Sequence, residues 1–76
     1  AGIVRALREA AEELAIDGWA PVAAAGRWIA ERHPDQLPAK YGCSSWRQVV
    51  HESRVFELRY REVDRQRAAW YRPKEA

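Results

Sequence analysis

The sequence predicts a mainly α-helical domain with a small β-hairpin, folded as a winged helix-turn-helix. Two observations predict this fold class. Turn and cap signals divide residues 2–53 into three segments with helical periodicity. The segment that follows, residues 55–72, alternates apolar and polar side chains with the period of two that is typical of strands. Three helices followed by a hairpin is the element order of a winged helix-turn-helix.

Residues 2–16 are predicted to form an amphipathic first helix. Their apolar side chains recur every three or four positions and therefore share one stripe. This stripe consists of Ile3, Val4, Leu7, Ala10, Ala11 and Leu14. Asp17-Gly18 is expected to end the helix, because glycine readily adopts the left-handed conformation found after helix C-termini. Trp19 then serves as an apolar anchor and is a candidate for a very short strand beneath the hairpin.

An alanine-rich segment, residues 22–32, predicts the second helix, since alanine is the strongest helix former. Gly26 lies in its middle, where glycine costs about 1 kcal/mol relative to alanine. The close approach of another helix is the usual compensation for that cost. Pro34 ends the helix, because proline disfavours the helical conformation of the residue before it. We expect Leu37 and Tyr41 to pin the connecting loop that follows to the core.

Ser45 and Gln48 match a capping box, in which a serine at the helix start is paired with a glutamine three residues later. They predict a short third helix over residues 45–53. Its inward side chains are expected to be Trp46, Val49 and Val50. The side chains left for solvent or for a partner are Arg47, Gln48, His51 and Arg54.

The hairpin is predicted from the alternation of its side chains. The first strand, near residues 55–61, carries Phe56, Leu58 and Tyr60 on one face and Glu57, Arg59 and Arg61 on the other. Residues 62–65 are predicted to make the turn. The second strand, residues 66–72, carries Ala68 and Trp70 on one face and Arg67, Ala69 and Tyr71 on the other.

The formal net charge of +2 is spread unevenly along the chain. Residues 1–39 contain four basic and six acidic side chains, which gives a net charge of −2. Residues 40–76 contain nine basic and five acidic side chains, which gives a net charge of +4. The basic half contains the predicted third helix and hairpin, so an anionic partner is favoured on that side. A solvated surface of mixed charge is the alternative.

The chain has 76 residues, enough for one small domain over residues 1–76. No apolar run approaches the roughly 20 residues that span a bilayer. The single cysteine, Cys43, cannot form an internal disulfide, so a reducing cytoplasm is the expected location. Cys43, His33 and His51 are too few for a zinc site, which takes about four ligands in paired spacing. We therefore expect no metal and no cofactor.

The sequence also lacks the side-chain sets on which catalysis depends. It shows no nucleophile beside a base, no pair of carboxylates with a reason to be buried together, and no glycine-rich phosphate loop. The prediction is that this domain is not an enzyme, and that any nuclease activity belongs to another domain of a longer parent protein.

The order and spacing of the turn and cap signals resemble those of the LOTUS domain, also called OST-HTH. The matching segments are Asp17-Gly18-Trp19-Ala20-Pro21, Gly26, Pro34-Asp35, Pro38, Tyr41-Gly42 and Tyr71-Arg72-Pro73-Lys74. The resemblance covers nearly all of the chain. The chain departs from the family pattern at Ala23, Ala25, Gln36, Cys43 and Trp46. The family often has a polar cap at the position of Ala23 and a leucine at the positions of Ala25 and Trp46. It often has an aromatic residue at the positions of Gln36 and Cys43.

This resemblance implies a role in RNA biology. LOTUS domains are associated with G-rich RNA and RNA G-quadruplexes, and bacterial members often follow an NYN-type ribonuclease domain in the same chain. An extended subclass with an extra C-terminal helix binds the Vasa helicase instead. This chain ends at Ala76 without room for that helix, and so it resembles the short bacterial form, excised from a longer protein.

Basic residues of the third helix and the hairpin are the candidate nucleic-acid-binding site. In winged helices the exposed face of the third helix is the one usually presented to nucleic acid. Arginines interleaved with Tyr60, Trp70 and Tyr71 suit single strands or exposed tetrads, because both groups stack on planar bases. The candidates are Lys40, Arg47, His51, Arg59, Arg61, Arg65 and Arg67. The alternatives are a solvated helix face and a hairpin charged to prevent edge pairing.

Three functions remain open from the sequence. The first is an RNA-binding module for G-rich or quadruplex RNA. The second is a protein-interaction module that recruits a helicase or self-associates, although the missing C-terminal helix argues against the Vasa-type interaction. The third is a duplex-DNA-binding winged helix. A short third helix with only Arg47, Gln48 and His51 facing outward argues against detailed major-groove recognition.

Overall fold

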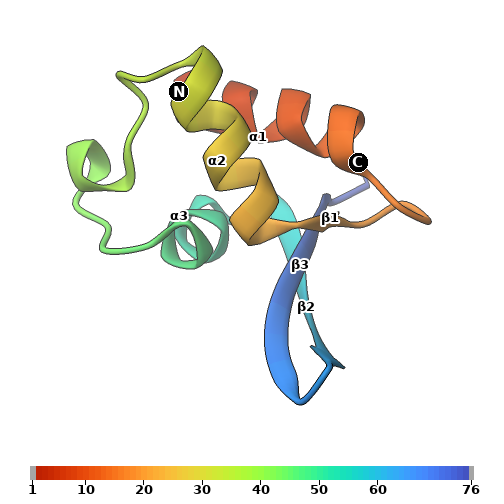
Figure 1. Cartoon of the computed structure of the whole chain (residues 1–76). Coiled ribbons are helices and arrows are strands. Elements are labelled where there is room, and N and C mark those ends of the chain that lie inside the picture. The colour runs from red at the N-terminus through yellow and green to blue at the C-terminus, as the bar shows by residue number, and fades with distance from the viewer. Residues whose placement is uncertain (1, 76) are drawn as a thin grey trace.

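The computed structural model describes residues 2–75 and has three α-helices and a three-stranded antiparallel sheet (Figure 1). Its elements are α1 (Gly2–Leu14), β1 (Ala20–Pro21), α2 (Val22–Arg32), the 3-10 helix η1 (Pro38–Tyr41), α3 (Trp46–Ser53), β2 (Phe56–Val63) and β3 (Gln66–Pro73). The helices gather at one end, and the β2–β3 hairpin extends away from them as a wing. The predicted winged-helix fold is confirmed.

The sheet has the strand order β1-β3-β2, so β3 pairs with both neighbours. The two residues of β1 pair with β3 at its base, where Ala20 lies opposite Tyr71 and Pro21 opposite Trp70. The β2–β3 ladder is much longer and runs from Phe56 opposite Pro73 to Val63 opposite Gln66. The distal half of the wing therefore has only two strands.

One face of the hairpin, which we call the core-side face, packs against the helices at its base. On this face Phe56 and Tyr71 are buried, while Leu58 and Ala69 are half-buried against the core. The ring of Phe56 meets that of Tyr71 edge-on, with centroids 5.3 Å apart. The Tyr71 hydroxyl donates a hydrogen bond of 2.6 Å to the backbone carbonyl of Leu7 in α1. The hairpin is thus tied to the first helix by a buried side chain.

The sequence-based expectation that Tyr71 belongs among the aromatics available to stack on RNA is wrong, since Tyr71 is fully buried. The alternation itself is confirmed, because Tyr71, Ala69 and Arg67 share a face. Near the helices this face packs into the core, whereas toward the tip it is exposed to solvent.

Two turns differ from the predictions. The predicted four-residue turn at residues 62–65 is wrong: Glu62 and Val63 continue β2, and only Asp64 and Arg65 form the turn. Both turn residues have positive φ angles, of 51° and 65°, as in a type I′ turn. The first helix ends at Leu14 rather than residue 16, because the Ile16–Trp19 hydrogen bonds close a tight turn instead.

The connecting loop is held differently from the prediction. Leu37 and Tyr41 were expected to pin it to the core, but they are 46% and 38% exposed. Backbone hydrogen bonds of η1 hold the loop instead, and the Tyr41 hydroxyl donates to the side-chain oxygen of Gln36 at 2.6 Å. The local fold therefore depends on polar contacts that apolar patterning does not reveal.

The cap of α3 agrees with its prediction in one of two bonds. The Ser45 hydroxyl accepts a hydrogen bond from the Gln48 backbone N–H at 3.1 Å. The Gln48 side chain reaches the backbone N–H of Ser44, at 2.8 Å, rather than that of Ser45. Both bonds still satisfy donors at the start of the helix, where no helical acceptor exists.

Gly26 lies at the contact between α2 and α3, as its position in the helix predicts. A Cβ atom at Gly26 would lie 2.5 Å from Cδ1 of Trp46 and 2.7 Å from its Nε1. Neither atom belongs to a flexible chain end, so a larger residue would displace the whole indole ring. The missing side chain of Gly26 thus makes room for Trp46.

Gly26→Leu is expected to lower the free energy of unfolding by about 1–3 kcal/mol, through overpacking against Trp46. Gly26→Ala should also destabilise the parent. In a Trp46→Ala background the same change should stabilise by about 1 kcal/mol, since only its helix propensity remains. Chemical denaturation of the four proteins in this cycle measures the coupling. A Gly26→Ala protein as stable as the parent would contradict the contact.

Candidate nucleic-acid interface

An open groove lies between α3 and the core-side face of the wing. It has a volume of about 330 Å³ and is lined by Arg47, Tyr60, Arg67 and Ala69, which we call the α3–wing groove. The Arg67 guanidinium lies 4.3 Å from the centroid of the Tyr60 ring. Arg47 donates a long hydrogen bond of 3.4 Å to the Tyr60 hydroxyl. Two guanidinium groups from different elements therefore meet at one aromatic ring.

The register of the hairpin explains why Tyr60 is available here. Tyr60 is on the same face as Phe56 and Leu58, but it lies beyond the part of the sheet that the helices cover, and it is 41% exposed. Ala69 is directly opposite it, and Arg67 is opposite Glu62, two residue pairs closer to the tip and on the same face. The small side chain of Ala69 leaves the groove open beside the Tyr60 ring.

The opposite face of the sheet holds a second set of arginines. Arg59 and Arg72 lie against the Trp19 ring, at 4.6 and 4.5 Å from its centroid, and Arg61 lies 5.1 Å from the Trp70 centroid. Arg72 also forms an ion pair with Glu57. We call these five residues, Trp19, Arg59, Arg61, Trp70 and Arg72, the Arg–Trp face.

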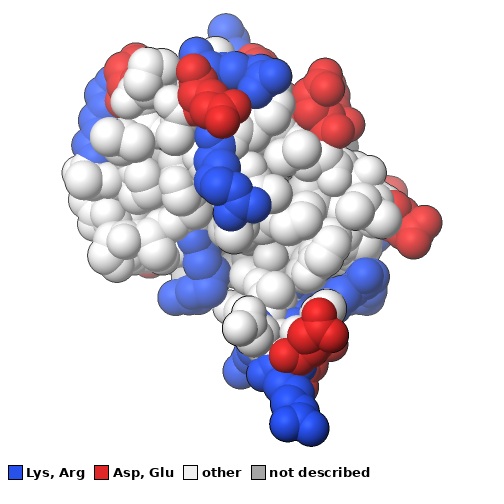
Figure 2. Space-filling model, viewed as in Figure 1, with Lys and Arg blue, Asp and Glu red and all other residues white. Residues whose placement is uncertain are grey.

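The structure thus separates the candidate residues instead of joining them in one site. Arg47 and Arg67 meet in the α3–wing groove, whereas Arg59 and Arg61 lie on the Arg–Trp face. Figure 2 shows basic side chains on both sides of the wing and at its tip, together with acidic ones near the tip. Alternation of side chains along a strand predicts that the strand has two different faces. It does not predict which residues from other elements pack against each face.

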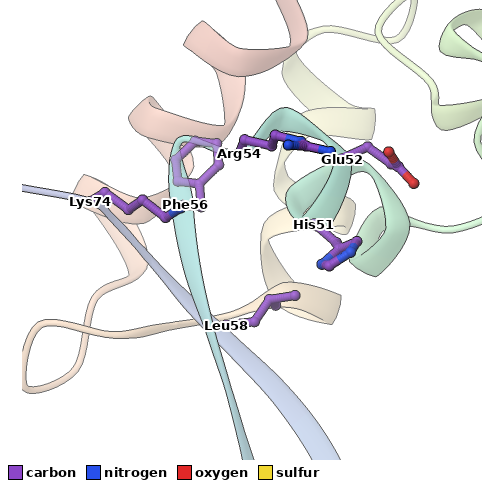
Figure 3. Close-up of a pocket in the computed structure, with 6 residues that line it drawn as sticks. All are labelled: His51, Glu52, Arg54, Phe56, Leu58 and Lys74. Atoms are coloured by element: carbon purple, nitrogen blue, oxygen red, sulfur yellow. The ribbon is translucent and has the colours of Figure 1, made fainter.

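Three candidates, Lys40, His51 and Arg65, lie outside both surfaces, and Arg65 is at the tip of the wing. His51 lines a separate depression of about 320 Å³, with Leu58 at the bottom of the view and Phe56 and Lys74 across from it (Figure 3). Lys40 is exposed on η1, with its ammonium 5.9 Å from the Tyr41 ring.

Trp19 and Arg72, which complete the Arg–Trp face, were not among the candidate site residues predicted from sequence. Trp70 was among the predicted aromatic residues, and its indole Nε1 is buried without an acceptor among residues 2–75. The sequence could have placed Arg72 beside Trp70, because residues two positions apart lie on the same face of a strand. Nothing in the sequence pattern brings Trp19 next to them, because that contact depends on the pairing of β1 with β3.

The positive charge of both surfaces is largely uncompensated. Within residues 2–75 no carboxylate forms an ion pair with Arg47, Arg67, Arg59 or Arg61. Arg65, exposed at the tip of the wing, also has none. Uncompensated arginines create a positive potential that attracts anionic partners.

Arg65 also occupies a backbone conformation that favours glycine. Its φ angle is 65°, and Asp-Gly is a preferred pair for a type I′ turn. A side chain in this left-handed region costs about 1–2 kcal/mol. The chain therefore keeps an arginine at the tip where glycine would fit the backbone better, which favours a functional role for the side chain.

Arg65→Gly is expected to raise the stability of the domain, by up to about 1 kcal/mol. It should also weaken RNA binding if Arg65 contacts the ligand. The matched control is Arg54→Gly, because Arg54 also has a positive φ angle, of 63°, at the end of α3. This control should gain similar stability and lose less RNA affinity than Arg65→Gly. A lower melting temperature for Arg65→Gly would contradict the strained turn.

The fold defines a winged-helix domain, a class whose members commonly bind other macromolecules. The model of the OST-HTH/LOTUS domain matches residues 1–68. Since this is most of the chain, the protein belongs to the OST-HTH/LOTUS family, whose domains are non-catalytic modules that bind RNA or proteins. Comparisons with curated proteins and with solved structures give no significant match. No helix in residues 2–75 has the length and apolar character needed to cross a membrane.

Proposed function

We propose that this domain binds G-rich RNA, and quadruplex-forming RNA in particular, through the α3–wing groove. The observation that carries the proposal is the arrangement of Arg47 and Arg67 around the exposed ring of Tyr60. Aromatic rings and guanidinium planes stack on exposed bases. A guanine tetrad is a broad planar surface bordered by phosphates, so it suits a ring flanked by two cations.

The other candidate residues extend this site in the proposal. Arg65 at the tip of the wing reaches phosphates beyond the groove, and His51 of α3 and Lys40 of η1 contact the RNA backbone. A ribonuclease domain of the NYN type in the same parent chain, which family resemblance implies, would receive the RNA that this domain holds.

Duplex DNA is the less favoured ligand. The α3 helix has only eight residues, Trp46–Ser53, and Arg47 is held toward the wing by Tyr60. Base-edge recognition in a major groove requires several side chains that project from one helix into the groove.

The test compares quadruplex-forming RNA, mixed-sequence RNA and duplex DNA of equal length, each at two salt concentrations. The domain should bind the quadruplex most tightly in potassium and lose that preference in lithium, which does not support the tetrads. The affinity should fall with salt, by a log–log slope of about −0.7 for each single-strand phosphate contacted. Equal affinity for quadruplex RNA and duplex DNA would reject the preference. If no nucleic acid binds at low salt, the protein-interaction function becomes the leading one.

A further inference from the structure

The Arg–Trp face combines Trp19, which directly precedes β1, with side chains of β2 and β3, and it is not an ordinary charged surface. Trp19 is only 7% exposed, yet it is not part of the apolar core cluster. Arg59 from β2 and Arg72 from β3 both lie against its ring. These guanidinium groups therefore supply cover that apolar side chains usually provide, and the tryptophan in turn holds them in place.

The need to cover the Trp19 ring does not explain why the Arg–Trp face has so many arginines. Arg72 is already paired with Glu57, so one arginine against the ring is neutralised. Arg59 is exposed and has no carboxylate partner within residues 2–75, and the same is true of the half-buried Arg61 against Trp70. The face thus presents two unpaired guanidinium groups, each positioned by an indole ring.

This chemistry fits a single-stranded nucleic acid. Guanidinium planes stack on unpaired bases, while their N–H groups donate to phosphates, and neither contact requires a particular base. An acidic peptide could meet the charge, but it would leave the stacking planes unused. Duplex nucleic acid would offer the phosphates without accessible base planes.

The location of the face decides which part of an RNA it would hold. It lies on the other side of the hairpin from the α3–wing groove, because successive residues of a strand point to opposite faces. An RNA element seated in the groove cannot also cover it. The tip of the wing borders both faces, and Arg65 is exposed there without a carboxylate partner in residues 2–75.

We propose that the Arg–Trp face is a second RNA site, which binds a single-stranded segment that flanks the structured element in the α3–wing groove. The role of the groove rests on the proposed function, whereas the second site rests on the stacked arginines.

The experiment uses three RNAs: a quadruplex without flanks, the same quadruplex with an unstructured tail of about eight nucleotides, and the tail alone. The tail should raise the affinity of the parent by about fivefold or more, which is what one stacked base contributes. Arg59→Gln with Arg61→Gln should remove this gain and keep the affinity for the untailed quadruplex. Arg47→Gln with Arg67→Gln should weaken the untailed quadruplex and keep binding of the tail alone.

The control is Arg5→Gln with Arg8→Gln, which removes two exposed charges from α1. A tail that adds no affinity to the parent, or a control that loses the gain as fully as the Arg59 and Arg61 variant, would overturn the second site. If Arg59→Gln with Arg61→Gln melts early, lysine at both positions keeps the charge without the planar stacking. That variant should lose most of the gain, and retention of the full gain would overturn the stacking.

The two proposals can fail separately. If the untailed quadruplex does not bind but the tail binds and depends on Arg59 and Arg61, then the groove proposal fails and the second site stands. If the untailed quadruplex binds and the tail adds nothing, then the second site fails and the groove proposal stands.

Discussion

Tyr71→Ala is expected to remove a large part of the stability of the domain and to lower its melting temperature by at least about 12 °C. Tyr71 is fully buried and joins the wing to α1 through its hydroxyl and to Phe56 through its ring. Truncating a buried aromatic residue to alanine costs about 3–5 kcal/mol. Domains of this size have a total stability of roughly 4–11 kcal/mol, so one substitution removes a large fraction of it.

Thermal and chemical denaturation measure this loss, and Tyr71→Phe is the matched control. It keeps the ring and removes only the hydrogen bond to Leu7, which is expected to cost about 0.5–1.5 kcal/mol. A Tyr71→Ala protein that melts within a few degrees of the parent would show that Tyr71 is not the link between the wing and α1.

The same pair of proteins should differ at alkaline pH. Burial raises the pKa of Tyr71 well above its ordinary value of 10.0, because the ionised phenol would lose its hydration. Below pH 10 the phenol is neutral in both the folded and unfolded states, and its contribution to stability is fully present. As the pH rises above 10, the unfolded state loses the proton first and stability falls. Tyr71→Phe should remove that part of the alkaline loss.

Reversing the charge of the α3–wing groove is expected to have the largest effect on binding. Arg47→Glu with Arg67→Glu should lower the affinity for quadruplex RNA at least about 100-fold, because two attractive contacts become repulsive. Both side chains are exposed, so the folded structure should persist. Fluorescence anisotropy or calorimetry measures the affinity, and circular dichroism measures the fold.

The matched control for this reversal is Arg5→Glu with Arg8→Glu, which makes the same change in net charge on the exposed side of α1. It should lose far less affinity than the groove variant, and only through the general decrease in positive charge. Equal losses in the two variants would mean that RNA responds to net charge alone, and the groove would then have no special role.

Much of the fold could be predicted from the sequence, because local signals set it. The capping serine Ser45 and the alanine-rich segment place α3 and α2 within a residue or so of their observed bounds. Gly26 marked a helix contact because its cost inside a helix required compensation. The length of the hairpin turn could not be predicted in this way, because Asp64-Arg65 lacks the glycine that usually identifies a two-residue type I′ turn.

The candidate site could be predicted only as a set of residue types. Alternation placed Arg59 on the face opposite Tyr60, but the position of α3 decides that Tyr60 and Arg67 meet Arg47. Likewise Trp19 is more than 35 positions from Arg59 in the chain, and the β1–β3 pairing brings them together. Both surfaces arise from packing between distant segments, which periodicity within one segment does not describe.

Because β1 has only two residues, the backbone hydrogen bonds of the hairpin are expected to differ in stability between its base and its tip. Only Trp70 and Tyr71 of β3 have strand partners on both sides, while residues 66–69 pair with β2 alone. Backbone amides near the tip should therefore exchange with deuterated solvent through small, frequent openings, whereas those beside β1 should exchange only through much rarer ones. The base of the wing would therefore stay rigid, while its two-stranded tip could change its angle to contact ligands of different thickness.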